Sequence, residues 1–263
     1  YLEKYNDEYI VIKCGGSVLV DQNLFDIFIK DITTLNKLGF IPIIVHGGGK
    51  RISNKLNELG IKSEFIKGLR VTRKETIEIV EKVLIEFNQE IVEALKKQSC
   101  NSETINSKDN NIISVTKEND RLGFVGTPTK IDKTIIDKIV NNKKVPVIAP
   151  LGLDESNRTY NINADTAAGS IAKKIEARRL IIMSDVEGVL DDGKKLIPEI
   201  NSTSIKDLID NEIITGGMIP KINNCLDVAS NGVKGVVIID GRKNHSILFE
   251  LLSDKGSGTL IRQ

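Results

Sequence analysis

The sequence predicts an α/β fold in which helices cover both faces of an open, mainly parallel sheet, a three-layer αβα sandwich. Short runs rich in Ile and Val alternate with helix-length amphipathic stretches, and this alternation is typical of buried parallel strands joined by helices. The apolar runs, such as residues 41–45 and 235–239, have the length of strands and are far shorter than the roughly 20 residues of a membrane span. The 263 residues suffice for one large α/β domain or two smaller lobes.

The first half of the chain is expected to form a strand over residues 9–13, a helix over 21–38, a strand over 41–45 and a helix that ends at Gly60. Gly15 and Gly16 turn the chain after the first strand, and Gly39 ends the first helix. Thr72 and Glu75 have capping-box spacing, which predicts that Thr72 caps the next helix. That helix should bury one face, because apolar residues recur at helical spacing: Ile77, Val80, Leu84, Phe87, Ile91 and Leu95.

The pattern weakens over residues 99–130 into short strands and turns, and residues 123–126 are expected to form a hairpin or flap. The remaining expected elements are a helix over 133–140, a strand over 145–149, a helix opened by 161–165, a strand over 180–183, a turn at 191–193, helices over 204–211 and 220–230, a strand over 235–240, a helix over 245–252 and a strand over 259–262. Without an internal repeat or a Pro/Ser-rich linker, we expect two lobes sharing one sheet, residues 1–178 and 179–263.

The charge balance and the cysteines exclude several classes of function. Lys and Arg number 37 against 36 Asp and Glu, and no segment combines basic with aromatic residues, so we expect neither a nucleic-acid nor a membrane partner. The three cysteines form no CxxC pair, which argues against disulfides and a zinc site and favours a reducing, intracellular compartment. No signal peptide opens the chain, and its start at Tyr1 rather than Met leads us to expect preceding residues.

Two glycine clusters follow expected strands, Gly15–Gly16 and residues 47–49. Ligands of open α/β sheets bind beyond the carboxyl ends of the strands, and glycine there lets backbone N–H groups approach an anion. Either pair of glycines alone is explained by a tight turn. Three consecutive glycines cost more backbone entropy than a turn requires, so the second cluster favours an anion site.

Other catalytic motifs fit poorly. The chain has no GxGxxG after a strand, and the nearest approach to a P-loop, residues 188–194, is followed by Lys195 instead of Ser or Thr. Residues 46–49 are similar to the oxyanion loop of esterases, but residues 15–19 lack the last glycine of a GxSxG elbow, and His245 would have to serve as the base. An esterase is therefore disfavoured.

Four charged residues are candidates for a ligand site, and each also has a simpler interpretation. Lys13 ends the first strand and Lys221 begins a helix after two glycines; each alone fits a solvated surface lysine. Asp165 fits a helix cap, or a carboxylate that orients two lysines. Arg70 fits a surface ion pair or a bidentate partner for a carboxylate. Their spacing leaves these alternatives open.

A series of glycine-rich and charged motifs occurs in an order that resembles one known family. These motifs are residues 11–16, 45–49, 68–72, 160–165, 184–188, 216–221 and 239–242. Over nearly its full length the chain resembles N-acetyl-L-glutamate kinases of the amino acid kinase family. The resemblance implies the fold of that family, which is similar to that of carbamate kinase.

The resemblance implies ATP-dependent phosphorylation of the γ-carboxylate of N-acetyl-L-glutamate, giving N-acetyl-L-glutamyl 5-phosphate for arginine biosynthesis. It implies ATP as cosubstrate, with Mg²⁺ carried by the nucleotide and no metal site in the protein. It assigns acetylglutamate binding and dimerisation to residues 1–178 and ATP binding to residues 179–263. A carboxylate with a pKa of about 4.3 is already ionised at neutral pH, so this acceptor needs no general base.

The resemblance also implies the site residues. Lys13 would stabilise the transferring phosphoryl group, Lys221 the leaving ADP, and Asp165 would hold both lysines. The residues implied for acetylglutamate are Gly47, Gly48, Gly49, Arg70, Asn161 and Asn163, with Arg70 on the α-carboxylate. The residues implied for ATP are Gly15, Gly16, Ser184, Asp185, Gly216, Gly217 and Met218.

Regulation is implied by the two ends of the chain. Residues 1–5 resemble the end of an N-terminal helix found in hexameric, arginine-inhibited members, and the stretch with His245 and Gly258 resembles their arginine pocket. We therefore expect a homo-oligomer, a dimer or trimer of dimers, with arginine as effector and the PII signalling protein as a possible partner. The expected compartment is a bacterial cytoplasm or a plastid stroma.

Two positions depart from the family pattern. Lys50 follows the triple glycine where Pro is common, and residues 127–128 are Thr-Pro where Glu-Val is usual, so the shape of the flap over residues 123–130 stays open. Within the same family, a glutamate 5-kinase or an aspartokinase is the alternative function. A catalytically silent sensor that binds a nucleotide or an anion is the alternative from another class.

Overall fold

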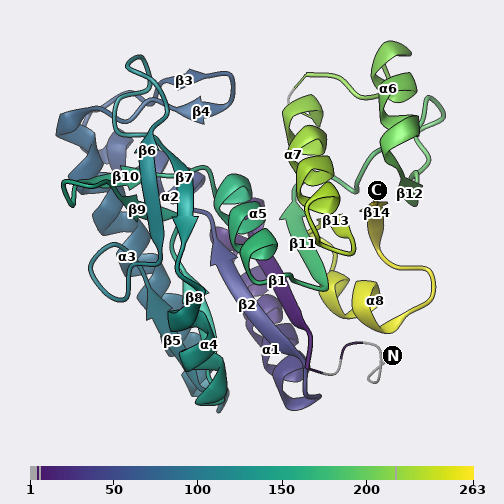
Figure 1. Ribbon diagram of the computed structural model, residues 1–263, viewed down its shortest axis with the longest axis horizontal. Helices are drawn as coiled ribbons and strands as arrows, with labels where there is room; N and C mark the ends of the chain where they lie inside the picture. The colour runs from purple at the N-terminus through teal and green to yellow at the C-terminus, as the bar shows by residue number, and fades with distance from the viewer. Residues whose placement is uncertain (1–4, 6, 217) are drawn as a thin grey trace.

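One continuous sheet runs through the molecule in the computed structural model, which describes residue 5, residues 7–216 and residues 218–263 (Figure 1). Within these residues it has eight strands in the order β12-β14-β13-β11-β1-β2-β8-β5. Their bounds are β1 (Tyr9–Cys14), β2 (Ile41–His46), β5 (Ser102–Ile105), β8 (Val145–Ile148), β11 (Arg179–Ser184), β12 (Glu199–Ile200), β13 (Val236–Asp240) and β14 (Gly258–Ile261). Neighbouring strands are parallel except β13 and β14, which run antiparallel.

Both faces of the sheet are covered by helices because the strands are apolar on both sides. Along β1, Val11 belongs to one buried cluster, whereas Ile10 and Ile12 belong to the other. The first cluster includes residues of α4 (Lys133–Asn141), α5 (Ala164–Lys174), α6 (Ser202–Asp210) and α7 (Met218–Ser230). The second includes residues of α1 (Gln22–Lys37), α3 (Lys74–Lys97) and α8 (Ser246–Leu252), and α2 (Gly49–Glu58) packs on α3. The predicted three-layer αβα sandwich is confirmed.

A smaller sheet stands beside the large one and contains the region where the sequence pattern weakened. Its order is β10-β9-β6-β7, with β6 (Ile113–Lys117), β7 (Gly126–Ile131), β9 (Leu151–Leu153) and β10 (Thr159–Asn161). The expected flap lies in the connection between the antiparallel strands β6 and β7. Bridges join Gly123 to Thr72 and Val125 to Asn161, so this connection is held against the strand that carries Asn161.

The expected helix start at Thr72 is wrong. The N-cap of α3 is Arg73, without a side-chain cap bond. Thr72 is fully buried, and its hydroxyl donates to the carbonyl of Arg70 at 3.2 Å. Its backbone bonds Leu122 and Phe124 on the neighbouring connection, and this tertiary pairing takes precedence over the local capping pattern. The predicted buried face of α3 is confirmed: Ile77, Val80, Leu84, Phe87, Ile91 and Leu95 are all buried.

The topology places the candidate site at one edge of the large sheet. β2, the next strand of the sheet in sequence, lies on one side of β1, and the much later β11 lies on the other side. The strand order thus reverses direction at β1, and open α/β sheets bind ligands in the crevice at such a switch point. A short 3₁₀-helix, η2 (Gly16–Leu19), follows β1, and a hairpin of β3 (Phe65–Ile66) and β4 (Leu69–Arg70) follows α2. In the described part of the chain, no helix is long and apolar enough to cross a membrane.

Candidate active site

A cleft of about 580 Å³ opens beyond the carboxyl ends of β1 and β2. Both glycine clusters line it, together with the β3–β4 hairpin and the start of α5. The predicted residues that it brings together include Lys13, Gly15, Gly48, Arg70, Asn161 and Asp165. A second hollow of about 660 Å³ is lined by Gly216, Lys221 and Asn224. Asp165 lines both, so one carboxylate stands between the two spaces.

Asp165 binds both of the predicted lysines. Its Oδ1 lies 2.9 Å from Nζ of Lys13, and its Oδ2 lies 2.6 Å from Nζ of Lys221. Lys13 comes from β1, Asp165 from the first turn of α5 and Lys221 from α7. Lys13 also donates to the carbonyl of Met183 on β11 at 3.2 Å. The group carries two ammonium charges and one carboxylate charge, which leaves a net positive charge at the junction.

The charge of Asp165 is fixed by these contacts. Burial alone would raise the pKa of this carboxyl, but the ammonium groups of Lys13 and Lys221 outweigh that effect and hold the pKa well below its usual range. Asn163 caps α5 by accepting the backbone N–H groups of Asp165 and Thr166 at 2.9 and 3.1 Å. Asn163 thus sets the position of Asp165, and the positive end of the helix favours its charge.

Close packing explains several of the predicted glycines. Gly16 has φ +65°, and a Cβ there would collide with the carboxylate of Asp185. At Gly15 a Cβ would collide with Nζ of Lys13, and at Gly48 with Leu84. Gly49 faces open space.

Gly47 lines the cleft, but its N–H donates to the carbonyl of Cys14 at 2.7 Å. This hydrogen bond joins the end of β2 to the end of β1 and fixes Gly47 in the wall of the cleft.

Arg70 is held by neutral groups only. Its guanidinium donates to the hydroxyls of Ser63 at 2.6 Å and Ser53 at 2.8 Å and to the carbonyl of Gly49 at 2.8 Å, and it lies 4.6 Å from the centre of the Phe65 ring. Burial lowers the pKa of Arg70. The structure records no ion pair to Arg70 among the described residues. A fixed, uncompensated cation on the wall of the cleft is suited to binding a carboxylate.

The residues predicted for ATP lie at the adjoining edge of the sheet. Ser184 ends β11, and its carbonyl accepts the N–H of Gly241 at 2.8 Å. The next residue, Asp185, accepts the backbone N–H of Ser17 at 2.7 Å. Gly216 has φ +53° and lines the hollow with Lys221, and Met218 begins α7. Gly217 lies outside the described residues.

A family comparison decides the class of the protein. Residues 8–240 match the sequence model described as Amino acid kinase family. The chain belongs to the amino acid kinase family. It is 71% identical, over its full length and 91% of the relative, to the acetylglutamate kinase of Pelagibacter ubique (strain HTCC1062). It is 44% identical, over its full length and 94% of the relative, to that of Campylobacter fetus subsp. fetus (strain 82-40).

Solved structures confirm the fold of this amino acid kinase. The carbamate kinase of Giardia lamblia bound to AMP-PNP superposes with a TM-score of 0.72 at 16% identity, over 99% of both chains. The N-acetylglutamate synthase of Neisseria gonorrhoeae, complexed with coenzyme A and N-acetyl-glutamate, gives 0.89 at 19% identity. This chain spans 61% of that longer synthase. At such identities the likeness concerns the fold alone, and the predicted carbamate kinase-like architecture is confirmed.

Sequence reasoning missed a residue that supports the first glycine loop of this amino acid kinase. Nε of Arg51 donates to the carbonyl of Leu19 at the end of η2, at 2.8 Å. Its guanidinium pairs with Glu90 of α3 at 2.5 and 3.0 Å and lies 3.9 Å from the centre of the Phe87 ring. The only sequence signal was its place in the first turn of the helix after the triple glycine.

His46 and Cys14 are buried beside the glycine loops. Burial lowers the pKa of His46 to about 4, so its neutral ring donates to the carbonyl of Gly47 at 2.8 Å and packs edge-on against Phe87. Burial raises the pKa of the Cys14 thiol to about 12. Both residues therefore stay uncharged at neutral pH and form part of the buried packing under the glycine loops.

The two residues predicted for an arginine site lie near the C-terminal end of the chain. His245 precedes α8 with φ 59°, and its Nδ1 lies 2.6 Å from the buried carboxylate of Asp31 on α1. Gly258 begins β14 so close to β13 that a Cβ would collide with the carbonyl of Ile238. The packing of two strands thus accounts for this glycine.

Proposed function

We propose that this amino acid kinase transfers the terminal phosphoryl group of ATP to the γ-carboxylate of N-acetyl-L-glutamate, giving N-acetyl-L-glutamyl 5-phosphate in arginine biosynthesis. The observation that carries the proposal is the position of Asp165, which holds one lysine from each side between the two hollows. The acetylglutamate kinases that match the full chain support the choice of acceptor.

The chemistry follows from the charges. The acceptor carboxylate is an anion at neutral pH, so no base has to remove a proton, and the obstacle is its repulsion from the phosphates. Lys13 neutralises the transferring group and Lys221 the leaving ADP oxygens, while Asp165 keeps the two ammonium groups in register. The glycine loops allow the phosphates to approach the backbone closely.

Mg²⁺ enters as part of MgATP and neutralises phosphate charge when bound. Among the described residues, no cluster of three or more His, Cys, Asp or Glu side chains is arranged to hold a metal ion. The donors on this chain are ammonium, guanidinium, hydroxyl and backbone N–H groups, which fit the phosphate oxygens of the nucleotide.

We expect Arg70→Lys to raise the KM for acetylglutamate about tenfold or more, because a lysine keeps the charge but loses the bidentate grip on the α-carboxylate. The KM for ATP should stay within about twofold. Initial rates of ADP release measure both constants. Arg73→Lys is the matched control, since Arg73 is exposed and pairs with Glu64 at 2.7 Å. An unchanged KM for acetylglutamate in Arg70→Lys would remove this role.

A substrate panel tests the function itself. ADP release is measured with acetylglutamate, glutamate and aspartate side by side, and only acetylglutamate should be turned over efficiently. Preference for glutamate or aspartate would instead identify a glutamate 5-kinase or an aspartokinase. Binding of MgATP without turnover of any of the three would identify a sensor.

The assignment of parts and regulation is also a proposal. Residues 1–178 would bind acetylglutamate and form a dimer, and residues 179–263 would bind ATP. Arginine would inhibit through the stretch with His245 and Gly258. The protein would form a dimer or a trimer of dimers, and the PII protein would modulate it. Of the N-terminal segment 1–5, only Tyr5 belongs to the described residues. The bacterial relatives favour a bacterial cytoplasm over a plastid stroma. Light scattering and ADP release with millimolar arginine, on the full-length protein, test assembly and inhibition together.

A further inference from the structure

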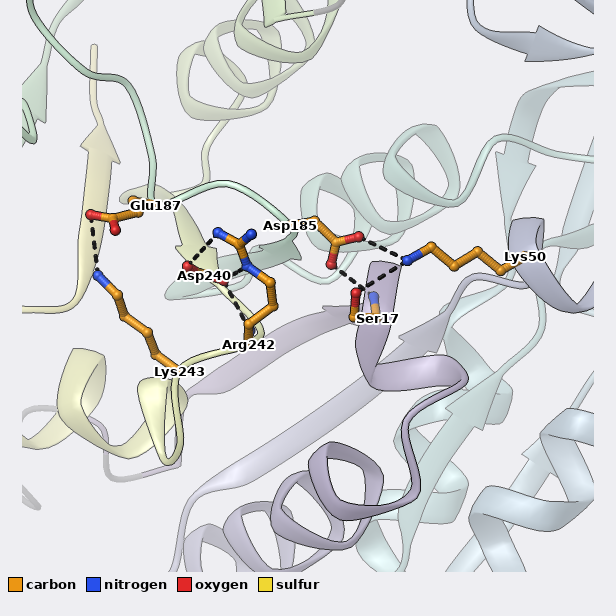
Figure 2. Close-up of polar contacts among 7 residues, drawn as sticks. All are labelled: Ser17, Lys50, Asp185, Glu187, Asp240, Arg242 and Lys243. Carbon is orange, nitrogen blue, oxygen red and sulfur yellow. Dashed lines mark hydrogen bonds and ion pairs between the residues drawn. The ribbon is translucent and has the colours of Figure 1, made fainter. Parts of the chain in front are cut away.

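A third lysine, outside the Asp165 group, reaches the glycine loop. Lys50 lies in the first turn of α2, and its Nζ lies 3.1 Å from Oδ2 of Asp185 and 3.1 Å from Oγ of Ser17. The backbone N–H of Ser17 donates to Oδ1 of the same carboxylate at 2.7 Å. Figure 2 shows the three residues converging from α2, from η2 and from the end of β11.

The Asp185 carboxylate occupies a position suited to a phosphate. It lies against Gly16, where a Cβ would collide with it. Its oxygens take one backbone N–H and one ammonium group, and the Ser17 hydroxyl stands beside that ammonium. A glycine backbone, a hydroxyl and a lysine are the donors that proteins commonly offer to phosphate oxygens.

Lys50 is better placed for a ligand than the two other cations at this edge. Figure 2 shows Arg242 with Asp240 and Lys243 with Glu187. Arg242 pairs through two nitrogens with Asp240, whose side chain is only 4% exposed, at 2.8 and 2.9 Å. Lys50 lines the cleft together with Lys13 and Gly16, and neither Arg242 nor Lys243 is among the residues that line it.

The ion pair between Lys50 and Asp185 also costs little to break. The two side chains are 49% and 36% exposed, and ion pairs as exposed as this contribute little to stability. A phosphate oxygen that replaced the carboxylate would therefore meet little opposition. Lys13 and Lys221, by contrast, keep a fixed position because each is paired with Asp165, whose side chain is 18% exposed.

We propose that Lys50, together with Ser17, binds the polyphosphate of the nucleotide, and that the Asp185 carboxylate holds this position until a phosphate displaces it. The inference rests on the proposed kinase function and deepens it, since it adds a nucleotide-binding residue from α2 on the acetylglutamate side of the cleft. Lys50 then acts on the nucleotide and leaves the acceptor untouched.

The test compares Lys50→Met with Lys55→Met. Lys55 is on the same helix, has the same exposed fraction of 49% and forms its own ion pair with Glu58 at 3.0 Å. In Lys50→Met the KM for MgATP should rise about tenfold, as expected for one charge-assisted bond, whereas kcat and the KM for acetylglutamate change less than about threefold. Lys55→Met should behave as the parent, and Lys50→Arg should restore most of the affinity because it keeps the charge.

Inhibitors identify the part of the nucleotide that Lys50 contacts. Inhibition by ADP should weaken in Lys50→Met by a factor similar to that for ATP, whereas inhibition by AMP should stay unchanged. If inhibition by AMP and by ADP weakened equally, Lys50 would only stabilise the fold, and the proposal would be overturned. A Lys50→Met variant with the same kinetics as Lys55→Met would also overturn it. Calorimetric titration with MgATP alone separates the two claims: reduced ATP affinity in Lys50→Met upholds the inference even if acetylglutamate proves not to be the acceptor.

Discussion

Replacement of Lys221 by alanine is expected to lower kcat by about two to three orders of magnitude, the usual cost of losing one preorganised donor to the transition state. Lys221 is bound to Asp165 at 2.6 Å, so its ammonium is held in place before the negative charge of the leaving ADP develops. The same loss is expected for Lys13→Ala, because Lys13 lies on the other oxygen of that carboxylate. Steady-state ADP release at saturating substrates measures kcat.

Lys173→Ala is the matched control for Lys221→Ala. Lys173 forms an ion pair of the same length, 2.6 Å, with Asp227, and it is not among the residues that line either hollow. Its replacement should leave kcat unchanged. A Lys221→Ala variant that unfolds at the parent temperature yet retains activity within a few-fold of the parent would contradict the role of Lys221.

Asp165→Asn is expected to impair both stability and activity. Without the carboxylate, the ammonium groups of Lys13 and Lys221 face each other in a site where the acidic side chain is 18% exposed. Loss of one partner from a largely buried charge group costs about 3–5 kcal/mol of unfolding free energy. The turnover should fall as strongly as in Lys221→Ala, because both lysines lose their common anchor.

The pH dependence gives this prediction its sign. The pKa of Asp165 is held below its ordinary value of 3.8 in the folded protein, so the stabilisation is complete above that value and is lost as pH falls through the lower folded pKa. In urea unfolding, the parent should therefore have a higher unfolding free energy than Asp165→Asn at pH 7 and at pH 5. This difference should disappear only in stronger acid. Asp227→Asn, at a partner that is 54% exposed, is the control. If the difference in unfolding free energy disappeared between pH 7 and pH 5, the proposed stabilisation by the ion pairs of Asp165 would be contradicted.

The architecture and the placement of the two lysines beside the glycine turns could be predicted because they depend on patterns that are local in sequence. Apolar runs alternate with amphipathic stretches, and glycines mark where strands end, so Lys13 and Lys221 could be placed beside the glycine turns at one edge of the sheet. Spacing alone left open whether Asp165 capped a helix or joined the lysines; the structure places it in the first turn of α5, bound to both. Spacing also left open whether Arg70 forms a surface ion pair or binds a carboxylate ligand. In the structure its side chain is buried and its hydrogen-bond partners are neutral.

Other features could not be predicted, because distant segments determine them. The pairing of Lys50 with Asp185 spans 135 positions, and it arises because β11 and β2, which precede these residues, both lie beside β1. Thr72 carries a capping signal, but its backbone pairs with a segment about fifty positions later. The β3–β4 hairpin and β12 have two residues per strand, too few for a recognisable periodicity.

The adjacency of β1 and β11 has a consequence for biosynthesis. The first strand pairs early with β2, but its other neighbour, β11, begins only at Arg179. Parallel pairing over such a separation is slow, since the entropy of closing the loop is lost before contacts form. Lys221 emerges from the ribosome later still. A nascent or truncated chain that ends before α7 (Met218–Ser230) lacks Lys221, so we expect no phosphoryl transfer from it.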